Sequence, residues 1–158
     1  MTQSSGHPQF IGHHRNRLDA KGRVSIPALF RNELRRPDGT AEPLVLRSSH
    51  QNPCLEAWPA SIFHGLASSF DRLDLFSDAN DDFAAALYGG AFPVEPDREG
   101  RIVLPPPLAA HAGIDEAVFF IGMGRRFFLW EPEAGERWLF EAPARVRASG
   151  RTLPAQLS

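Results

Sequence analysis

Two short segments of this sequence alternate between aliphatic and other side chains in the same way. In residues 23–26 and 101–104 the second and fourth positions are aliphatic, and each segment begins with an arginine. Successive side chains of a β-strand point to opposite faces, so this period of two predicts two strands with one face in a core. Arg23 and Arg101 then point away from that core. The aliphatic residues predicted to be buried are Val24, Ile26, Ile102 and Leu104.

Prolines mark the ends of both predicted strands. Pro27 and Pro105 hold the residue before them extended, and proline is also well suited to the first turn of a helix. The residues that follow predict short helices at 28–36 and 108–112, and Gly113 is the expected stop of the second helix. Both segments therefore run from strand to helix through a proline.

The rest of the chain predicts further strands and helices in a regular order. Strands are expected at 44–47, 55–58, 118–121 and 127–130, and helices at 59–70 and 132–140. An acidic helix, capped by Ser77 or Asp78 and ended by Gly89-Gly90, is expected in between, since negative charge suits the first turn of a helix. After Pro143 the composition turns to Ala, Arg, Pro and Ser, so the last residues are expected to be mobile.

The whole pattern occurs twice. Residues 18–27 (LDAKGRVSIP) recur as residues 96–105 (PDREGRIVLP), which share D-x-x-G-R, two aliphatic positions and a proline. The similarity continues downstream, where the offset between the copies falls from 78 residues at the D-x-x-G-R motifs to 72 at the strands that end in tryptophan. Two copies in the same order indicate a duplicated unit.

The D-x-x-G motifs predict tight turns. Aspartate is favoured at the first position of a type I turn and glycine at the fourth, and a glycine of positive φ there completes a hairpin with a bulge. Both motifs are therefore interpreted as hairpin tips. The residues with structural roles in these turns are Asp19, Gly22, Asp97 and Gly100, and none of them is expected to be a contact residue.

These motifs resemble those of the MraZ family, bacterial regulators related to the AbrB-type swapped-hairpin DNA-binding proteins. The resemblance rests on Phe10-Ile11-Gly12, on residues 18–27 and on the second D-x-x-G-R at 97–101, and it extends over residues 10–142. It implies an α+β fold of two tandem AbrB-like swapped-hairpin repeats, which form a pseudo-dimeric, β-barrel-like core with short peripheral helices. The implied organisation is a flexible N-terminal extension (1–9), a first repeat (10–75), a linking helix (76–90), a second repeat (91–142) and a flexible C-terminal tail (143–158).

The same resemblance implies a function. A protein of this kind is expected to bind double-stranded DNA at promoter repeats as a ring-like homo-oligomer of the octamer or dodecamer class, in the cytoplasm and associated with the nucleoid. The implied outcome is repression of the division and cell-wall gene cluster, including the protein's own operon. The family places basic loop residues at DNA, and the matching positions are Lys21, Arg23 and Arg101. In the second motif Glu99 replaces the lysine, and Arg98 is expected to be a secondary contact.

The near-neutral total charge does not exclude a polyanionic partner. The net formal charge is only −2, but residues 1–36 hold seven basic against two acidic residues and residues 37–100 hold three against eleven. Binding responds to a local patch rather than to the sum. We therefore expect Arg23 and Arg101 to approach phosphates or guanine edges in the major groove. Ion pairs that hold these arginines within the protein, or orientations toward opposite sides of the assembly, would overturn this expectation.

Alternatives remain open for several basic residues. Arg23 and Arg101 could be solvated turn arginines, although the repetition at the same turn position favours DNA contact. Arg15 and Arg17 share one face of a strand that leads to the first tip. They either extend the basic patch or keep an edge strand from associating with another.

Catalytic and metal sites are not indicated. His13 and His14 are adjacent, so in a strand they point to opposite faces and cannot chelate one metal ion. A single cysteine, Cys54, excludes a disulfide framework and a multi-cysteine zinc site. No run approaches about eighteen apolar residues, and no signal peptide is expected. We expect no cofactor, small-molecule substrate, membrane contact or enzymatic activity. The alternatives are a protein-interaction ring that binds an acidic protein through the tips, and a small hydrolase.

Overall fold

The computed structural model describes residues 7–70 and 78–152, which form an α+β fold with a mostly antiparallel sheet. The first copy contributes β1 (His13–Arg17), β2 (Arg23–Ser25), α1 (Ala28–Leu34), β3 (Leu44–Ser48), β4 (Leu55–Pro59) and α2 (Ala60–Phe70). The acidic helix α3 (Asp78–Ala84) continues as the π-helical turn η1 (Ala85–Gly89). The second copy contributes β5 (Phe92–Val94), β6 (Arg101–Val103), α4 (Pro106–Ala112), β7 (Ala117–Gly122), β8 (Phe127–Trp130) and α5 (Pro132–Ser149). Ser77, one of the two expected caps of the acidic helix, lies outside the described residues.

Strand pairing exchanges partners between the two copies. The main sheet has the order β1-β7-β8-β4-β3-β5, so the first strand of each copy pairs with the third strand of the other. The fourth strands, β4 and β8, meet in the middle, and the second strands, β2 and β6, form a separate two-stranded ribbon. The sheet shows the same succession of first, third and fourth strands from either edge. This symmetry indicates a pseudo-two-fold axis between β4 and β8.

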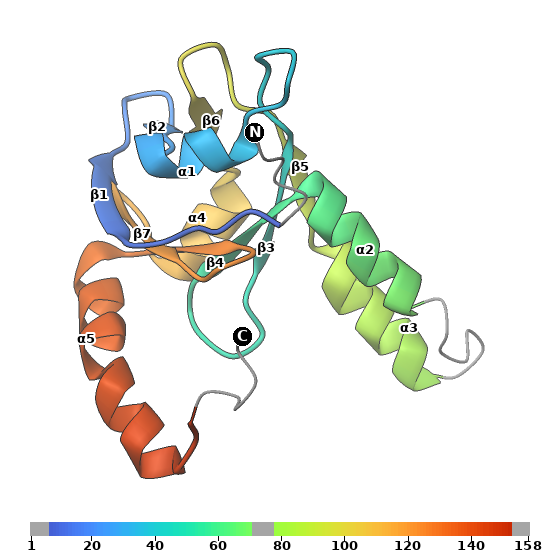
Figure 1. The fold of residues 1–158 in the computed structure, drawn as a ribbon, viewed down its shortest axis with the longest axis vertical. Coiled ribbons are helices and arrows are strands. Elements are labelled where there is room, and N and C mark those ends of the chain that lie inside the picture. The colour runs from blue at the N-terminus through green and yellow to red at the C-terminus, as the bar shows by residue number, and fades with distance from the viewer. Residues whose placement is uncertain (1–6, 71–77, 153–158) are drawn as a thin grey trace, which may run out of the picture.

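The described strands do not close into the barrel-like core that the resemblance implied. The main sheet is open, with β1 and β5 at its edges, and the β2–β6 ribbon forms no ladder with either of them (Figure 1). Both ribbon strands are only three residues long and are soon followed by Pro27 and Pro105. Because proline has no N–H, it cannot continue a hydrogen-bond ladder toward the sheet.

One face of the main sheet, the ribbon, α1 and α4 enclose the larger apolar core. The four aliphatic residues predicted to be buried are at most 4% exposed, which confirms the alternation. Phe30 of α1 is fully buried, and its ring lies against those of Phe10 and Phe127, with centroids 5.4 and 4.9 Å away. The ribbon is therefore held to the sheet by side-chain packing and by one side-chain hydrogen bond, from Nδ2 of Asn16 in β1 to the Ser25 carbonyl in β2 (2.7 Å), and not by a backbone ladder.

The helices that start at prolines form as predicted, with small shifts of their ends. α1 ends at Leu34, two residues before its predicted end, and α4 begins at Pro106, two residues before its predicted start. Gly113 ends α4 in the left-handed region, at φ 65°. The N–H of Ile114 donates to the carbonyl of Ala109 across this glycine (3.0 Å), which closes the helix as a Schellman motif does.

The opposite face of the main sheet carries a smaller apolar cluster beneath α5. The rings of Phe128 and Trp130 lie against Trp138 of α5, with centroids 5.7 and 5.4 Å away. α5 approaches the sheet so closely at Gly135 that a Cβ there would overlap the side chains of Trp130 and Phe119. Each face of the sheet is thus covered by different helices (Figure 1).

α5 is longer than the sequence predicted. Its expected end was residue 140, with a mobile tail from Pro143, but the helix continues through this proline to Ser149. The guanidinium of Arg145 donates to the carbonyl of Trp138 (2.7 Å) and lies over its ring at 4.7 Å, so it supports the helix around the proline. Alanine and arginine are also strong helix formers. Neither α5 nor any other helix among the described residues is long and apolar enough to cross a membrane.

Candidate nucleic-acid interface

Two loops with the same backbone geometry connect the first and second strands of each copy. We call residues 18–22 the first loop and residues 96–100 the second loop. The N–H of Gly22 donates to the Asp19 carbonyl (3.0 Å), and the N–H of Gly100 donates to the Asp97 carbonyl (2.9 Å). Both glycines lie in the left-handed region, at φ 77° and 79°, where other residues are strained. These are the hydrogen bonds and the positive φ angles that the D-x-x-G motifs predicted.

The strands around each loop differ from a simple hairpin. β1 and β2 flank the first loop, but β1 pairs with β7 and β2 pairs with β6. The predicted hairpin tips therefore connect strands whose ladder partners belong to the other copy. As a result, the two loops sit at the two ends of one short ribbon.

Each loop is held by its aspartate. Oδ1 of Asp19 accepts from the backbone N–H groups of Lys21 and Arg23 (both 2.9 Å), and Asp97 makes the equivalent bonds in the second loop. The backbone N–H of Arg23, followed by its side chain, lowers the pKa of Asp19 to about 2. The backbone N–H of Arg101 likewise lowers the pKa of Asp97. Hydrogen bonds to a carboxylate favour its charged form, so both loops carry a fixed negative charge beside an arginine.

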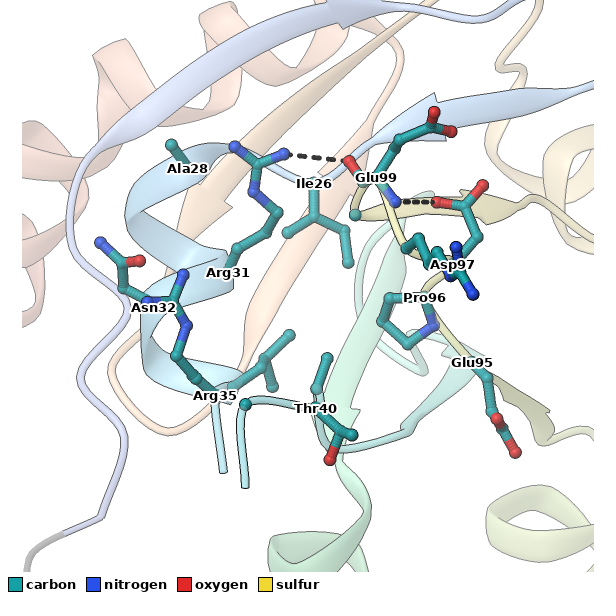
Figure 2. Close-up of a pocket in the computed structure, with 15 residues that line it drawn as sticks. Ile26, Ala28, Arg31, Asn32, Arg35, Thr40, Glu95, Pro96, Asp97 and Glu99 are labelled. Atoms are coloured by element: carbon teal, nitrogen blue, oxygen red, sulfur yellow. Dashed lines mark hydrogen bonds between the residues drawn. The ribbon is translucent and has the colours of Figure 1, made fainter. Parts of the chain in front are cut away.

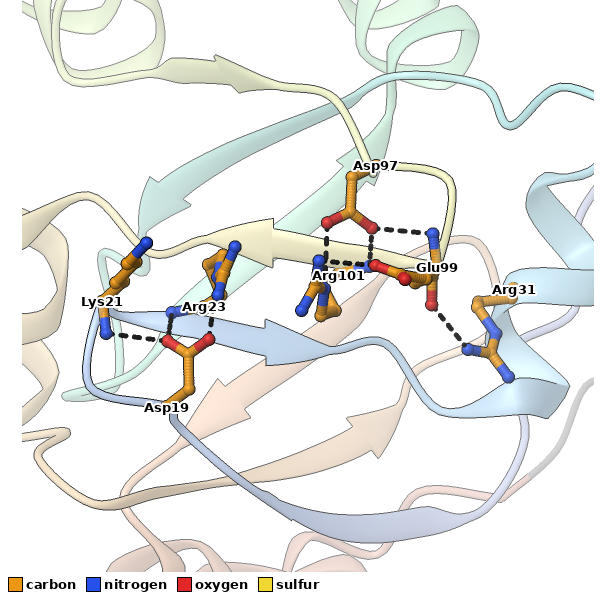
Figure 3. A network of polar contacts seen from close by, with 7 residues as sticks. All are labelled: Asp19, Lys21, Arg23, Arg31, Asp97, Glu99 and Arg101. Atoms are coloured by element: carbon orange, nitrogen blue, oxygen red, sulfur yellow. Dashed lines mark hydrogen bonds and ion pairs between the residues drawn. The ribbon is translucent and has the colours of Figure 1, made fainter.

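Arg23 and Arg101 lie on the same face of the ribbon. In the β2–β6 ladder Val24 pairs with Ile102, and both are buried. Residues before and after a buried strand residue point to the other face, which places both arginines on the outer face (Figure 3). The structure therefore brings together the two arginines that the sequence singled out, and they do not face opposite sides.

Both arginines are nevertheless in ion pairs within their own loops. Nε of Arg23 lies 2.7 Å from Oδ2 of Asp19, and Nε of Arg101 lies 2.9 Å from Oδ2 of Asp97. Arg101 is engaged a second time, because its Nη2 lies 2.5 Å from Oε1 of Glu99. The hydrogen bond that Arg101 donates to Asp97, with further attraction from Asp97, Glu99 and Asp19, raises the pKa of Arg101. The expectation that neither arginine is paired within the protein is therefore wrong.

The two arginines differ in how many terminal guanidinium nitrogens remain available for a ligand. The side chains of Arg23 and Arg101 are 32% and 31% exposed. A guanidinium has five N–H donors, of which Nε carries one. In Arg23 both terminal nitrogens lack a protein partner among the described residues, whereas in Arg101 one of them is taken by Glu99. Arg23 can thus offer a full terminal fork to an anion, and Arg101 can offer only part of one.

The other predicted contact residues fall into two groups. Lys21 and Arg98 are exposed in the first and second loops, close to the two arginines. Arg15 and Arg17 are also exposed, but they pair with Phe119 and Ala117 in the β1–β7 ladder. They therefore lie on the sheet face that carries α5, not on the face of the ribbon. Their position on the edge strand β1 favours the role of keeping this edge from associating.

Sequence analysis missed Arg31 of α1, which contacts the second loop. Its Nη1 donates to the carbonyl of Glu99 (3.2 Å), and its side chain fills the space where a Cβ on Gly100 would be. Arg31 lines a cleft of about 590 Å³ between α1 and the second loop, together with Arg35, Arg98 and three acidic residues (Figure 2). No sequence pattern connects residues 31 and 99, because the contact depends on how α1 packs against the ribbon.

The single cysteine of the chain is not an activated nucleophile. Cys54 is fully buried, and this burial raises the pKa of its thiol to about 12, so the reactive thiolate is scarce at neutral pH. No group of three or more His, Cys, Asp or Glu side chains among the described residues could hold a metal ion. The arrangement of the two loops is suited to binding anions by charge and hydrogen bonds.

Comparisons with known proteins agree with the repeat and the loops. A family model described as "MraZ protein, putative antitoxin-like" matches residues 10–85 and 87–145. A protein of Gluconacetobacter diazotrophicus named "Transcriptional regulator MraZ" is 57% identical over 148 residues, which cover 93% of this chain and 92% of that protein. Proteins of the same name from Gluconobacter oxydans and Xanthobacter autotrophicus are 48% and 42% identical, over 87% and 88% of this chain and 85% and 87% of theirs. With its duplicated D-x-x-G-R loops and these relatives, the chain belongs to the MraZ family.

Proposed function

We propose that this chain is a transcriptional regulator that binds double-stranded DNA through its two loops and has no enzymatic activity. The observation that supports this most directly is the position of Arg23 and Arg101 on one outer face of the β2–β6 ribbon. A guanidinium matches the geometry of a phosphate or of the O6 and N7 edge of guanine. In this proposal the two copies are tandem swapped-hairpin units, and the exchanged strand pairing brings their loops to one surface.

In this proposal the ion pairs within the loops do not block DNA binding, so the criterion that such pairs overturn it is too strict. An exposed ion pair is worth only ~0.2–1 kcal/mol, whereas an arginine contact to DNA is worth ~1–3 kcal/mol. Asp19 holds Nε of Arg23 and leaves the terminal nitrogens without a protein partner among the described residues. The aspartate thus orients the guanidinium before DNA arrives, which reduces the entropy lost on binding. Lys21 and Arg98 supply additional positive charge beside the two arginines.

One protomer of this kind binds DNA weakly, because two loops neutralise few phosphates. Several loop pairs on a ring-like homo-oligomer would gain affinity on repeated promoter elements through their high effective concentration. We propose this mode of binding for the chain, with repression of the division and cell-wall gene cluster and of its own operon as the outcome. The protein would then act in the cytoplasm, associated with the nucleoid.

A titration of labelled upstream DNA at two salt concentrations tests this proposal. The double variant Arg23→Ala/Arg101→Ala should lose at least tenfold in affinity and show a shallower salt dependence, since fewer counterions are released. Arg147→Ala is the matched control, because it removes an exposed arginine of α5 far along the chain from the loops. If the double variant folds normally and keeps both the affinity and the salt dependence of the unaltered protein, the loops are not the DNA-binding surface.

The same titration separates DNA binding from the alternative of an interaction ring for an acidic protein. Nonspecific DNA competes with labelled promoter DNA only through the charge of its backbone, so a large excess should be needed to displace the specific complex. Equal displacement by promoter and nonspecific DNA at physiological salt would favour a general polyanion-binding surface and contradict sequence-specific regulation.

A further inference from the structure

We propose that Glu99 competes with DNA for Arg101, so that the second loop is intrinsically weaker than the first loop in each protomer. This inference rests on the proposed DNA-binding function and assigns unequal shares of it to the two loops. It makes Glu99 a residue that limits affinity, although it contacts no DNA itself.

The ion pair between Glu99 and Arg101 is the basis of the proposal. Oε1 of Glu99 lies 2.5 Å from Nη2 of Arg101, while Asp97 occupies Nε of the same guanidinium (Figure 3). The two carboxylates thus take two nitrogens of the guanidinium, Nε and Nη2, which are donors that a phosphate would otherwise use. A DNA phosphate that approaches Arg101 must displace Glu99 or come close to its negative charge. Both cost binding free energy.

The first loop has no such competitor. Under the 78-residue offset between the motifs, the position of Glu99 corresponds to Lys21, so the first loop has a positive charge where the second has a negative one. Only Asp19 pairs with Arg23 among the described residues. An approaching phosphate therefore meets two cations and one carboxylate in the first loop, but two cations, Arg98 and Arg101, and two carboxylates in the second.

Arg31 adds a structural difference between the two loops to the difference in charge. Its guanidinium donates to the carbonyl of Glu99 and packs against Gly100, so the backbone that carries the competing carboxylate is held in place. The corresponding residue of α4 is Ala109, and a Cβ on Gly22 would meet nothing within 4 Å. The second loop is braced by a helix, and the first loop is open on that side.

Single substitutions at Glu99 test the proposal in the full-length chain, with labelled upstream DNA as the probe. Glu99→Gln keeps the size of the side chain and removes its charge, and Glu99→Lys supplies the residue that the first loop has. The control is Glu95→Gln, which removes the same charge from an exposed residue lining the same cleft. Glu99 is 70% exposed, so these variants should fold like the unaltered protein.

We expect Glu99→Gln to raise the affinity about two- to fivefold above Glu95→Gln, which is the range an exposed ion pair supplies. Glu99→Lys should raise it further and steepen the salt dependence by about one unit per protomer, because another phosphate can be neutralised. In an Arg101→Ala background the gain from Glu99→Gln should fall to that of Glu95→Gln. This loss of the gain would show that Glu99 acts through Arg101.

Two results would overturn the proposal and leave DNA binding intact. One is an equal gain from Glu99→Gln and Glu95→Gln, which would mean a general charge effect. The other is a gain from Glu99→Gln that survives Arg101→Ala. If instead the unaltered protein shows no salt-dependent binding to its upstream DNA, the proposed function itself fails, and this outcome is recognised before any variant is compared.

Discussion

The two copies have the same arrangement of strands, but their side chains differ on the sheet face that points away from the larger core. In the first copy Arg47 of β3 lies opposite Glu56 of β4, and in the second copy Ile121 of β7 lies opposite Phe128 of β8. The two pairs therefore occupy equivalent positions. In the first copy these positions hold an ion pair of 2.7 Å between side chains that are 6% and 10% exposed. In the second copy they are apolar and lie beneath α5.

This difference shows which constraints the duplicated fold imposes on both copies. Positions that face the larger core are apolar in both, since the two copies build that core together. On the opposite face of the sheet, the residue types differ between the copies because a different element covers each copy. Arg47 donates to the Ala86 carbonyl of η1 and contacts His50, whereas Phe128 packs against Trp138 of α5. The same holds for the two loops, which have the same backbone geometry but different neighbouring side chains.

The largest effect is expected when the buried ion pair of the first copy is broken. Glu56→Ala leaves the Arg47 guanidinium buried without its carboxylate and removes the acceptor of the Trp58 indole N–H (3.0 Å). Loss of one partner of a buried pair costs ~3–5 kcal/mol. We expect this decrease in the free energy of unfolding, measured by denaturant titration.

The second copy supplies the matched control for this variant. Arg47→Ile combined with Glu56→Phe copies the apolar pair at the equivalent positions, and replacement of a buried ion pair by apolar residues is often close to neutral. The double variant should therefore be more stable than Glu56→Ala alone. Equal destabilisation by the two variants would contradict the equivalence of the two copies on this face.

The next largest effect concerns DNA affinity and distinguishes the loops. Arg23→Ala removes a guanidinium whose terminal nitrogens have no protein partner among the described residues, and Arg101→Ala removes one that Asp97 and Glu99 already neutralise. We expect a loss of ~1–3 kcal/mol of binding free energy for Arg23→Ala, the range of a direct DNA contact, and a smaller loss for Arg101→Ala. Fluorescence anisotropy with promoter DNA measures both, and a greater loss for Arg101→Ala would reverse the assigned order.

A smaller effect is expected on protein stability when the glycine of each loop is replaced. Gly22→Ala and Gly100→Ala both place a side chain in the left-handed region, at a cost of ~1–2 kcal/mol. Gly100→Ala also displaces Arg31, so it should lower the melting temperature more than Gly22→Ala. In an Arg31→Ala background the two glycine variants should become equal. A difference that persists without Arg31 would mean that the helix does not brace the second loop.

The smallest expected effect is on the pH dependence of stability, and it should have the same direction in both loops. The pKa of Asp19 is lowered from 3.8 to about 2 in the folded protein, and that of Asp97 is lowered in the same direction. The unfolded chain therefore binds protons first as the pH falls, and the stability that each carboxylate contributes is present above about pH 4 and lost below it. Asp19→Asn should flatten the dependence of stability on pH between about 4 and 2, and Asp97→Asn should flatten it in the same direction below about pH 4. Asp115→Asn, at an exposed position outside the loops, should leave it nearly unchanged.

Local sequence patterns predicted much of the fold and part of the site. The alternation in 23–26 and 101–104 correctly assigned the buried faces, because the period of side chains along a strand is a local property. The aspartate and glycine of each loop formed the predicted turn hydrogen bonds for the same reason. The repeated arginine drew attention to Arg23 and Arg101, which the structure brings to one face.

The sequence by itself determined which residues face the core, where the turns lie, and that the unit is duplicated, because these properties depend on neighbours a few positions apart. Only the tertiary structure decided that strands pair across the copies, that Arg31 reaches Glu99, and that Arg15 and Arg17 lie on the face away from the ribbon. It also decided that Arg47 and Glu56 are buried together and that Glu99 neutralises Arg101. These contacts depend on which surfaces pack against each other, and the free energy of that packing comes from segments far apart in the chain.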